Sequence, residues 1–178
     1  MAELKKAMCQ LRMAFDNSDG AEFKRLVQNN PSLIDVVNGE ENYLWIAAMM
    51  KNLPIVKALV ELGADINRSN DLSGGDESHP FYEPEGIVLQ SIRSRDAESI
   101  SWLLENGAKL NFEIQGEVRC LPLIAAAVAG DLEIVKMLVK HGAVLDSKFH
   151  GADAIRHADE NGKVEVRDYL VSLRNSGK

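Results

Sequence analysis

The sequence predicts an all-α protein built as a solenoid of stacked helix–turn–helix units. Three stretches align with one another: "IVKALVELGADIN" from Ile55, "SISWLLENGAKLN" from Ser99 and "IVKMLVKHGAVLD" from Ile134. In each stretch apolar residues recur at helical spacing, and the pattern ends with Gly-Ala. Such recurrence predicts units that stack on one another, because one unit cannot bury its apolar face alone.

Each of these helices has a predicted end and a predicted partner helix. Gly63, Gly107 and Gly142 stand where a helix that closes through a left-handed residue needs glycine. A shorter apolar segment precedes each long helix: "LWIAAMMKN", "VLQSIRSRD" and "LIAAAVAGD". These segments carry small residues that allow the paired helices to approach closely: Ala47, Ala48, Ser91, Ala126 and Ala127.

With these elements in place, the sequence resembles the ankyrin repeat family, whose pattern runs T-P-L-H-x-A, helix, glycine turn, second helix and G-A-D-x-N. "LWIAAMMKNLPIVKALVELGADIN" matches most of it, and "LPLIAAAVAGDLEIVKMLVKHGAVLD" matches nearly as well. The resemblance implies one domain over residues 1–178, with degenerate terminal copies that shield the open ends of the stack. The expected repeats are approximately 4–36, 37–68, 81–112, 116–147 and 148–173.

The chain departs from the family pattern in two respects. No copy has the full Thr-Pro-Leu-His; only residues 121–124 keep Pro-Leu, and Trp45 occupies the position of the family's histidine. Gly107 follows Gly63 by 44 residues, about 11 more than the period of about 33. The surplus predicts a long loop over residues 69–85, where glycines and prolines cluster.

Composition and charge narrow the function. The 178 residues carry a net charge of −7, which opposes binding to the phosphates of nucleic acid. No apolar stretch approaches the roughly 18 residues of a membrane helix, and Cys9 and Cys120 do not form a metal or disulfide pattern. We therefore expect a cytoplasmic protein that binds neither nucleic acid nor membrane.

The sequence contains no recognisable catalytic constellation, and we expect no catalytic residue, cofactor or metal. The four histidines are scattered, and His141 precedes a helix-ending glycine, where an imidazole suits the helix dipole. Asp153, His157 and Asp159 could suggest a metal site, but Asp153 stands where a helix N-cap is expected. "DLSGGDE" lacks the Gly-Lys-Ser/Thr of a phosphate-binding loop.

The resemblance implies a binding surface made by finger-like inter-repeat turns and by the exposed side of the first helices. Met49 and Met50 fall at the helix end that the family turns toward partners, although Met49 could instead fill the core. Acidic and aromatic residues crowd the fingers, which would attract a basic partner unless this acidity only maintains solubility. The residues predicted to contact a partner are Glu41, Tyr43, Trp45, Met49, Met50, Asp76, Glu77, Phe81, Tyr82, Glu83, Glu85, Arg93, Phe112, Glu113, Glu117 and Glu160.

These expectations lead to a non-enzymatic protein-binding module, monomeric when free, that binds and inhibits a partner with a basic surface. Small ankyrin proteins of this kind are similar to immunity proteins that block a cognate bacterial toxin. The alternative is a regulatory adaptor, similar to ankyrin-type inhibitors of cyclin-dependent kinases. A third hypothesis, from another class, is an enzyme whose site lies in the 71–85 loop, with His79 beside Asp76 or Glu77.

Overall fold

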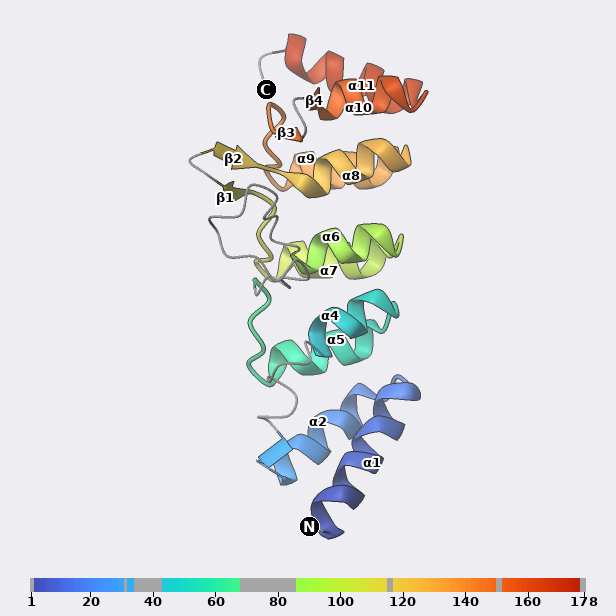
Figure 1. The fold of residues 1–178 in the computed structure, drawn as a ribbon, viewed down its shortest axis with the longest axis vertical. Helices are drawn as coiled ribbons and strands as arrows, with labels where there is room; N and C mark the ends of the chain where they lie inside the picture. The colour runs from blue at the N-terminus through green and yellow to red at the C-terminus, as the bar shows by residue number, and fades with distance from the viewer. Residues whose placement is uncertain are drawn as a thin grey trace.

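The chain forms a stack of helix pairs, and the all-α solenoid predicted from the sequence is confirmed (Figure 1). The computed structural model describes residues 2–30, 32–33, 43–67, 86–114, 117–149 and 152–176. The helix pairs of the described residues are α1 (Ala2–Asp16) with α2 (Gly20–Asn29), α4 (Tyr43–Met49) with α5 (Leu53–Glu61), α6 (Ile87–Arg93) with α7 (Ala97–Glu105), α8 (Leu121–Ala129) with α9 (Leu132–Lys140), and α10 (Ala154–Glu160) with α11 (Val164–Asn175).

Two short antiparallel hairpins precede the last two helix pairs. Strand β1 (Phe112–Ile114) pairs with β2 (Glu117–Arg119), with Phe112 opposite Arg119. Strand β3 (Lys148–Phe149) pairs with β4 (Ala152–Asp153). The turns expected between repeats therefore have strand pairing here, and β1 and β2 extend beyond the helical stack in Figure 1.

The same turn joins the two helices of every pair. A residue with left-handed backbone comes first: Ser18, Lys51, Arg95, Gly130 and Gly162. The N–H of the next residue then donates to a carbonyl five residues earlier, as from Asp96 to Ser91 at 3.0 Å and from Lys163 to Ala158 at 2.8 Å. In four of the five turns the residue after the left-handed one is Asp or Asn, and its side chain caps the second helix: Asp19, Asn52, Asp96 and Asp131.

The glycines predicted to end the second helices have the expected conformation. Gly63, Gly107 and Gly142 have φ angles of +93°, +87° and +86°. The N–H of the following alanine donates to a carbonyl five residues earlier in each case, as from Ala108 to Leu103 at 2.9 Å. Carbonyls that would otherwise lack a partner at the helix end are thereby satisfied.

Asparagine side chains join successive repeats. Asn67 accepts from the backbone N–H of Lys109 at 2.7 Å. Asn111 bridges the next step, because it donates to the carbonyl of Gly142 at 2.8 Å and accepts from the N–H of Val144 at 3.0 Å. These contacts supply polar links between units that lack the Thr and His of the family pattern.

The core lies between the helices along the whole stack. Successive first helices contact one another from α4 through α6 and α8 to α10, and α2 contacts α5. The small residues predicted to permit close approach, Ala47, Ala48, Ser91, Ala126 and Ala127, are fully buried. Leu59, Leu103 and Leu138, at equivalent positions of three second helices, are fully buried as well.

The two cysteines differ sharply in accessibility, which leads to a prediction. Cys9 is exposed, whereas Cys120 is buried, its N–H donates to Ser147 Oγ at 2.6 Å, and burial raises the pKa of its thiol to about 11. Because the thiolate is the reactive form, we expect Ellman's reagent to modify one thiol rapidly in the native protein at pH 8 and two in 6 M guanidinium. Rapid reaction of the native Cys9→Ser variant, which keeps only Cys120, would contradict the burial of Cys120.

Candidate protein-binding face

The first helices of the pairs form a face with exposed apolar side chains. Met49 and Met50 lie at the end of α4 and are 45% and 53% exposed, and Val128 on α8 is 39% exposed. Both methionines thus lie at the surface, and Met49 does not fill the core. Exposed apolar clusters of this type commonly mark interaction surfaces.

The N-terminal part of this face contains a hollow of about 660 Å³ between α1 and α4. Its lining combines Met8 and Met13 of α1 with Ile46 and Met50 from the region of α4. The two helices meet at the ring of Tyr43, which lies edge-on to Phe15 with 6.1 Å between ring centroids. Methionine suits adaptable contacts because its side chain is flexible and polarisable.

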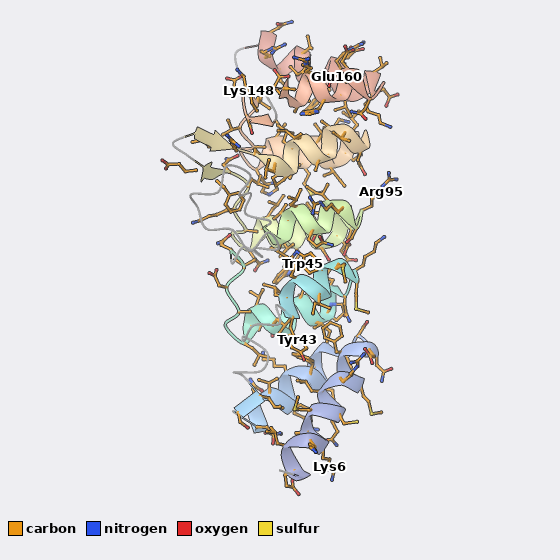
Figure 2. All side chains as sticks on the ribbon, in the orientation of Figure 1. Lys6, Tyr43, Trp45, Arg95, Lys148 and Glu160 are labelled. Carbon is orange, nitrogen blue, oxygen red and sulfur yellow. The ribbon has the colours of Figure 1, made fainter. Side chains whose placement is uncertain are left out.

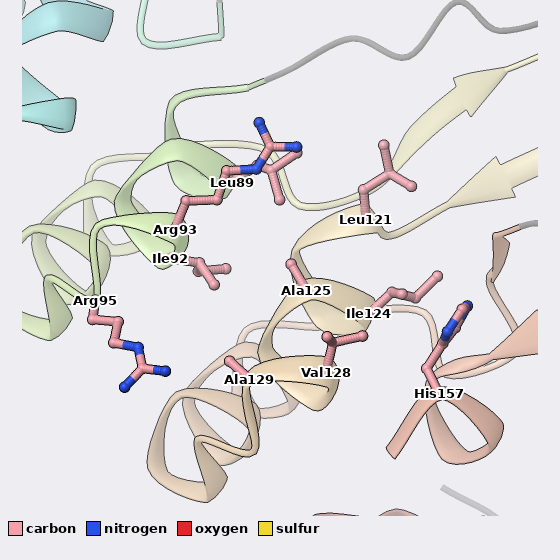
Figure 3. Close-up of a pocket in the computed structure, with 10 residues that line it drawn as sticks. All are labelled: Leu89, Ile92, Arg93, Arg95, Leu121, Ile124, Ala125, Val128, Ala129 and His157. Carbon is pink, nitrogen blue, oxygen red and sulfur yellow. The ribbon is translucent and has the colours of Figure 1, made fainter. Parts of the chain in front are cut away.

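A second pocket, of about 400 Å³, lies between α6 and α8 (Figure 3). Its apolar lining comes from both helices: Leu89, Ile92, Leu121, Ile124, Ala125, Val128 and Ala129. Arg93 and Arg95 border it on the α6 side, and His157 of α10 borders it on the far side of α8. Arg93 was predicted from the sequence as a contact residue, whereas Arg95 and His157 were not, because nothing in their spacing marks a pocket.

Four of the predicted contact residues belong to first helices, with Tyr43 and Trp45 in α4, Arg93 in α6 and Glu160 in α10; Figure 2 labels Tyr43, Trp45 and Glu160. Arg93 is exposed, while Tyr43 and Trp45 are half-buried and the indole nitrogen of Trp45 is buried. The Glu160 carboxylate forms an ion pair with Arg156 at 2.8 Å. Ser94, next to Arg93, does not point freely outward, since its hydroxyl donates to the Met49 carbonyl at 3.2 Å and so ties α6 to α4.

The predicted fingers are described only in part. Glu113 in β1 is exposed, whereas Phe112 is half-buried, because its ring lies against Gly86 at the start of α6. Glu117 begins β2. The remaining predicted finger residues lie outside the described residues: Glu41, Asp76, Glu77, Phe81, Tyr82, Glu83 and Glu85.

The described part of the face carries more cations than its acidic sequence suggests. Arg93 and Arg95 are exposed at the pocket between α6 and α8, and Arg12 at the N-terminal hollow lies 3.6 Å from Asp16. The described acids on this face include Asp16 at the N-terminal hollow and Glu160 at the end of α10, so the first helices carry charges of both signs.

The residues that suggested a metal site serve the structure of the last repeat. Asp153 caps α10 by accepting from the N–H of Arg156 at 2.9 Å, and it also forms an ion pair with Arg174 at 3.2 Å. Asp159 forms an ion pair with Arg167 at 2.9 Å. Within the described ranges, no three His, Cys, Asp or Glu side chains are grouped as metal ligands would be. His79, Asp76 and Glu77 of the enzyme hypothesis lie outside the described residues.

Among the helices that the structure describes, none combines the length and the apolar character needed to cross a bilayer.

The repeated turn, the stacked pairs and the grooved face define a helical repeat protein with a binding surface. The family model for ankyrin repeats in three copies matches residues 88–177, and the model for a single ankyrin repeat matches residues 41–71. The chain belongs to the ankyrin repeat family. Ankyrin repeats form protein–protein interaction modules, and proteins of the family are typically non-enzymatic.

Relatives come from a virus and from mammals. An ankyrin repeat protein of fowlpox virus is 29% identical over 102 residues, which cover 57% of this chain and 17% of that protein. Ankyrin repeat and SAM domain-containing protein 6 of Rattus norvegicus is 25% identical over 116 residues, which cover 65% of this chain and 12% of that protein. The chain thus spans less than a fifth of the length of either relative.

Proposed function

We propose that this protein binds and inhibits a partner protein that has a basic surface. The observation that carries the proposal is the pair of apolar hollows between the first helices, where Met8, Met13 and Met50 line one hollow and Val128 lines the second. Binding of a partner would remove these apolar side chains from water, and this burial lowers the free energy of the complex. Aromatic and methionine side chains are also enriched at the centres of interfaces.

The basic character of the partner rests on the charge of the chain and of its fingers. The net charge is −7, and the exposed Glu113 in β1 lies on a hairpin that extends beyond the helices. Opposite charge on a partner would steer its approach and raise the association rate, with strong dependence on salt. Neutralisation of a toxic basic enzyme, as immunity proteins achieve, is one form that such inhibition would take.

Purification of the tagged protein from its native host at low and at moderate salt tests the proposal directly. We expect a stable co-eluting protein whose contact surface is rich in Lys and Arg, and whose activity falls when one equivalent of this protein is added. Recovery of no stable partner at either salt concentration would reject the binding proposal. A stable partner that retains full activity would reject inhibition and favour an adaptor.

The substitution Met50→Glu is expected to abolish partner binding with little loss of stability. Met50 is 53% exposed and lines the N-terminal hollow, so a carboxylate there leaves the fold intact but must lose its water when a partner covers it. Surface substitutions usually change the free energy of unfolding by less than about 0.5 kcal/mol. Calorimetric titration with the purified partner should show at least a tenfold weaker complex.

Val164→Glu is the matched control for this substitution. Val164 is also apolar and is 51% exposed, close to the 53% of Met50. It begins the last helix of the stack and lines neither hollow. We expect it to bind the partner normally. A Met50→Glu protein that unfolds several degrees earlier than Val164→Glu would instead place Met50 in the core.

A further inference from the structure

The pocket between α6 and α8 combines an apolar lining with basic side chains. Its apolar lining would hold a side chain away from water, and its volume of about 400 Å³ falls within the roughly 300–1,000 Å³ of typical ligand pockets. The described residues that line it include Arg93, Arg95 and His157 but neither Asp nor Glu. A basic segment would find apolar contact there but no charge to complement its own.

Arg95 stands at a position where glycine would be less strained. It is the left-handed residue of the α6–α7 turn, with φ of +54°, and the equivalent residues in the last two repeats are Gly130 and Gly162. A side chain at this position costs backbone energy that glycine avoids. Arg95 is exposed, and both Arg95 and Arg93 line the pocket from the α6 side, as Figure 3 shows.

We propose that the α6–α8 pocket receives an apolar side chain from a partner segment that carries a carboxylate close to that side chain, and that Arg95 binds the carboxylate. This inference rests on the proposed function and specifies the partner segment that the face recognises. The basic surface of the partner would then face the acidic fingers, while a short acidic and apolar segment would lie in the groove. Arginine is suited to the second contact because its planar fork can donate two hydrogen bonds to one carboxylate.

Selection from a phage-displayed library of random twelve-residue peptides on the immobilised full chain tests the proposal. We expect enrichment of peptides that have Leu, Ile, Phe or Met within four residues of Asp or Glu. Binding of a selected synthetic peptide should weaken about tenfold with Arg95→Gly, the loss expected when one charge-assisted contact is removed. Val128→Asp should weaken it further, since a carboxylate would then border the apolar floor.

Two controls separate loss of the contact from loss of the fold. Arg95→Gly should leave the thermal midpoint unchanged or raised, because glycine relieves the left-handed backbone. Lys51→Gly removes a cation from the equivalent turn of an earlier repeat, where φ is +56°, and lies outside the lining of the α6–α8 pocket. It should bind the peptide as the wild type does. The peptide with Asp or Glu changed to its amide should bind wild type and Arg95→Gly equally.

Enrichment of Lys or Arg in the selected peptides would overturn the proposal, as would the absence of any enriched sequence. Equal binding of an acidic peptide to wild type and Arg95→Gly would overturn the role of Arg95. The peptide results test only the pocket assignment. The proposed function is tested separately, by whether a natural partner co-elutes from the host. A natural basic partner whose affinity is unchanged by Arg95→Gly would retain the function and reject the pocket assignment.

Discussion

Gly20→Ala is expected to destabilise the protein, although the same change stabilises most helices. Gly20 is the first residue of α2, where alanine would ordinarily gain up to about 1 kcal/mol. A methyl group on Gly20 would overlap the carbonyl oxygen of Pro54 in α5 and would lie 2.9 Å from its carbonyl carbon. Those atoms are backbone, so they cannot rotate away, and overpacking of this kind costs about 1–3 kcal/mol.

The cost should fall on the contact between the first two helix pairs. Helix α2 packs directly on α5, so separation of these helices would detach the N-terminal pair from the rest of the stack. Each pair contacts only its neighbours, and we therefore expect faster amide hydrogen exchange in residues 2–30 with little change in residues 121–140. Urea unfolding followed by circular dichroism measures the total loss.

Gly107→Ala is the matched control for Gly20→Ala. Gly107 has φ of +87°, and a methyl group there would meet no atom within 4 Å. It should lose about 1 kcal/mol through backbone strain alone, and its exchange should rise around the end of α7. Gly20→Ala with wild-type stability or better would contradict the close approach of α2 to α5.

The fold could be predicted from local patterns because residues within each repeat mark where its helices end and which side of them is packed. Gly63, Gly107 and Gly142 mark helix ends, and the small residues before them mark the packed side of the first helices. Both features depend on backbone geometry within about 30 residues, so sequence spacing is sufficient to reveal them. The asparagine bridges were not predicted, because Asn67 and Asn111 bond to residues 31 to 42 positions later in the chain.

The candidate site was predicted less completely, for two physical reasons. The pocket beside Arg95 combines side chains from α6, α8 and α10, and its existence depends on the distance between stacked repeats, which spacing along the chain does not encode. Met8 and Met13 were missed for the same reason: they become part of the groove only because α1 and α4 leave a hollow between them. One partial signal was present at Arg95, since the aligned turns of the last two repeats have Gly130 and Gly162 there, whereas those of the first two have Ser18 and Lys51.

Leu103→Ala is expected to give the largest loss of stability and to damage the α6–α8 pocket indirectly. Leu103 in α7 is fully buried, and truncation of a buried leucine to alanine costs about 2–5 kcal/mol through lost burial and the cavity left behind. Helix α7 packs against α6, which supplies Leu89, Ile92 and Arg93 to the pocket and leads directly into Arg95. Loss of order in this central pair also interrupts the stack between α4 and α8.

The position of the damage distinguishes Leu103→Ala from general destabilisation. We expect two unfolding transitions in urea, because the helix pairs on either side of α6–α7 no longer stabilise each other through it. Leu170→Ala, which truncates a leucine that is equally buried but lies in the last helix, should instead loosen only α10 and α11 and keep a single main transition. Leu4→Ala should change the free energy of unfolding by less than about 0.5 kcal/mol, since Leu4 is exposed. A single cooperative transition in Leu103→Ala would instead mean that the α6–α7 pair still couples the repeats on either side of it despite the cavity, and peptide binding would then decline only in proportion to the unfolded fraction.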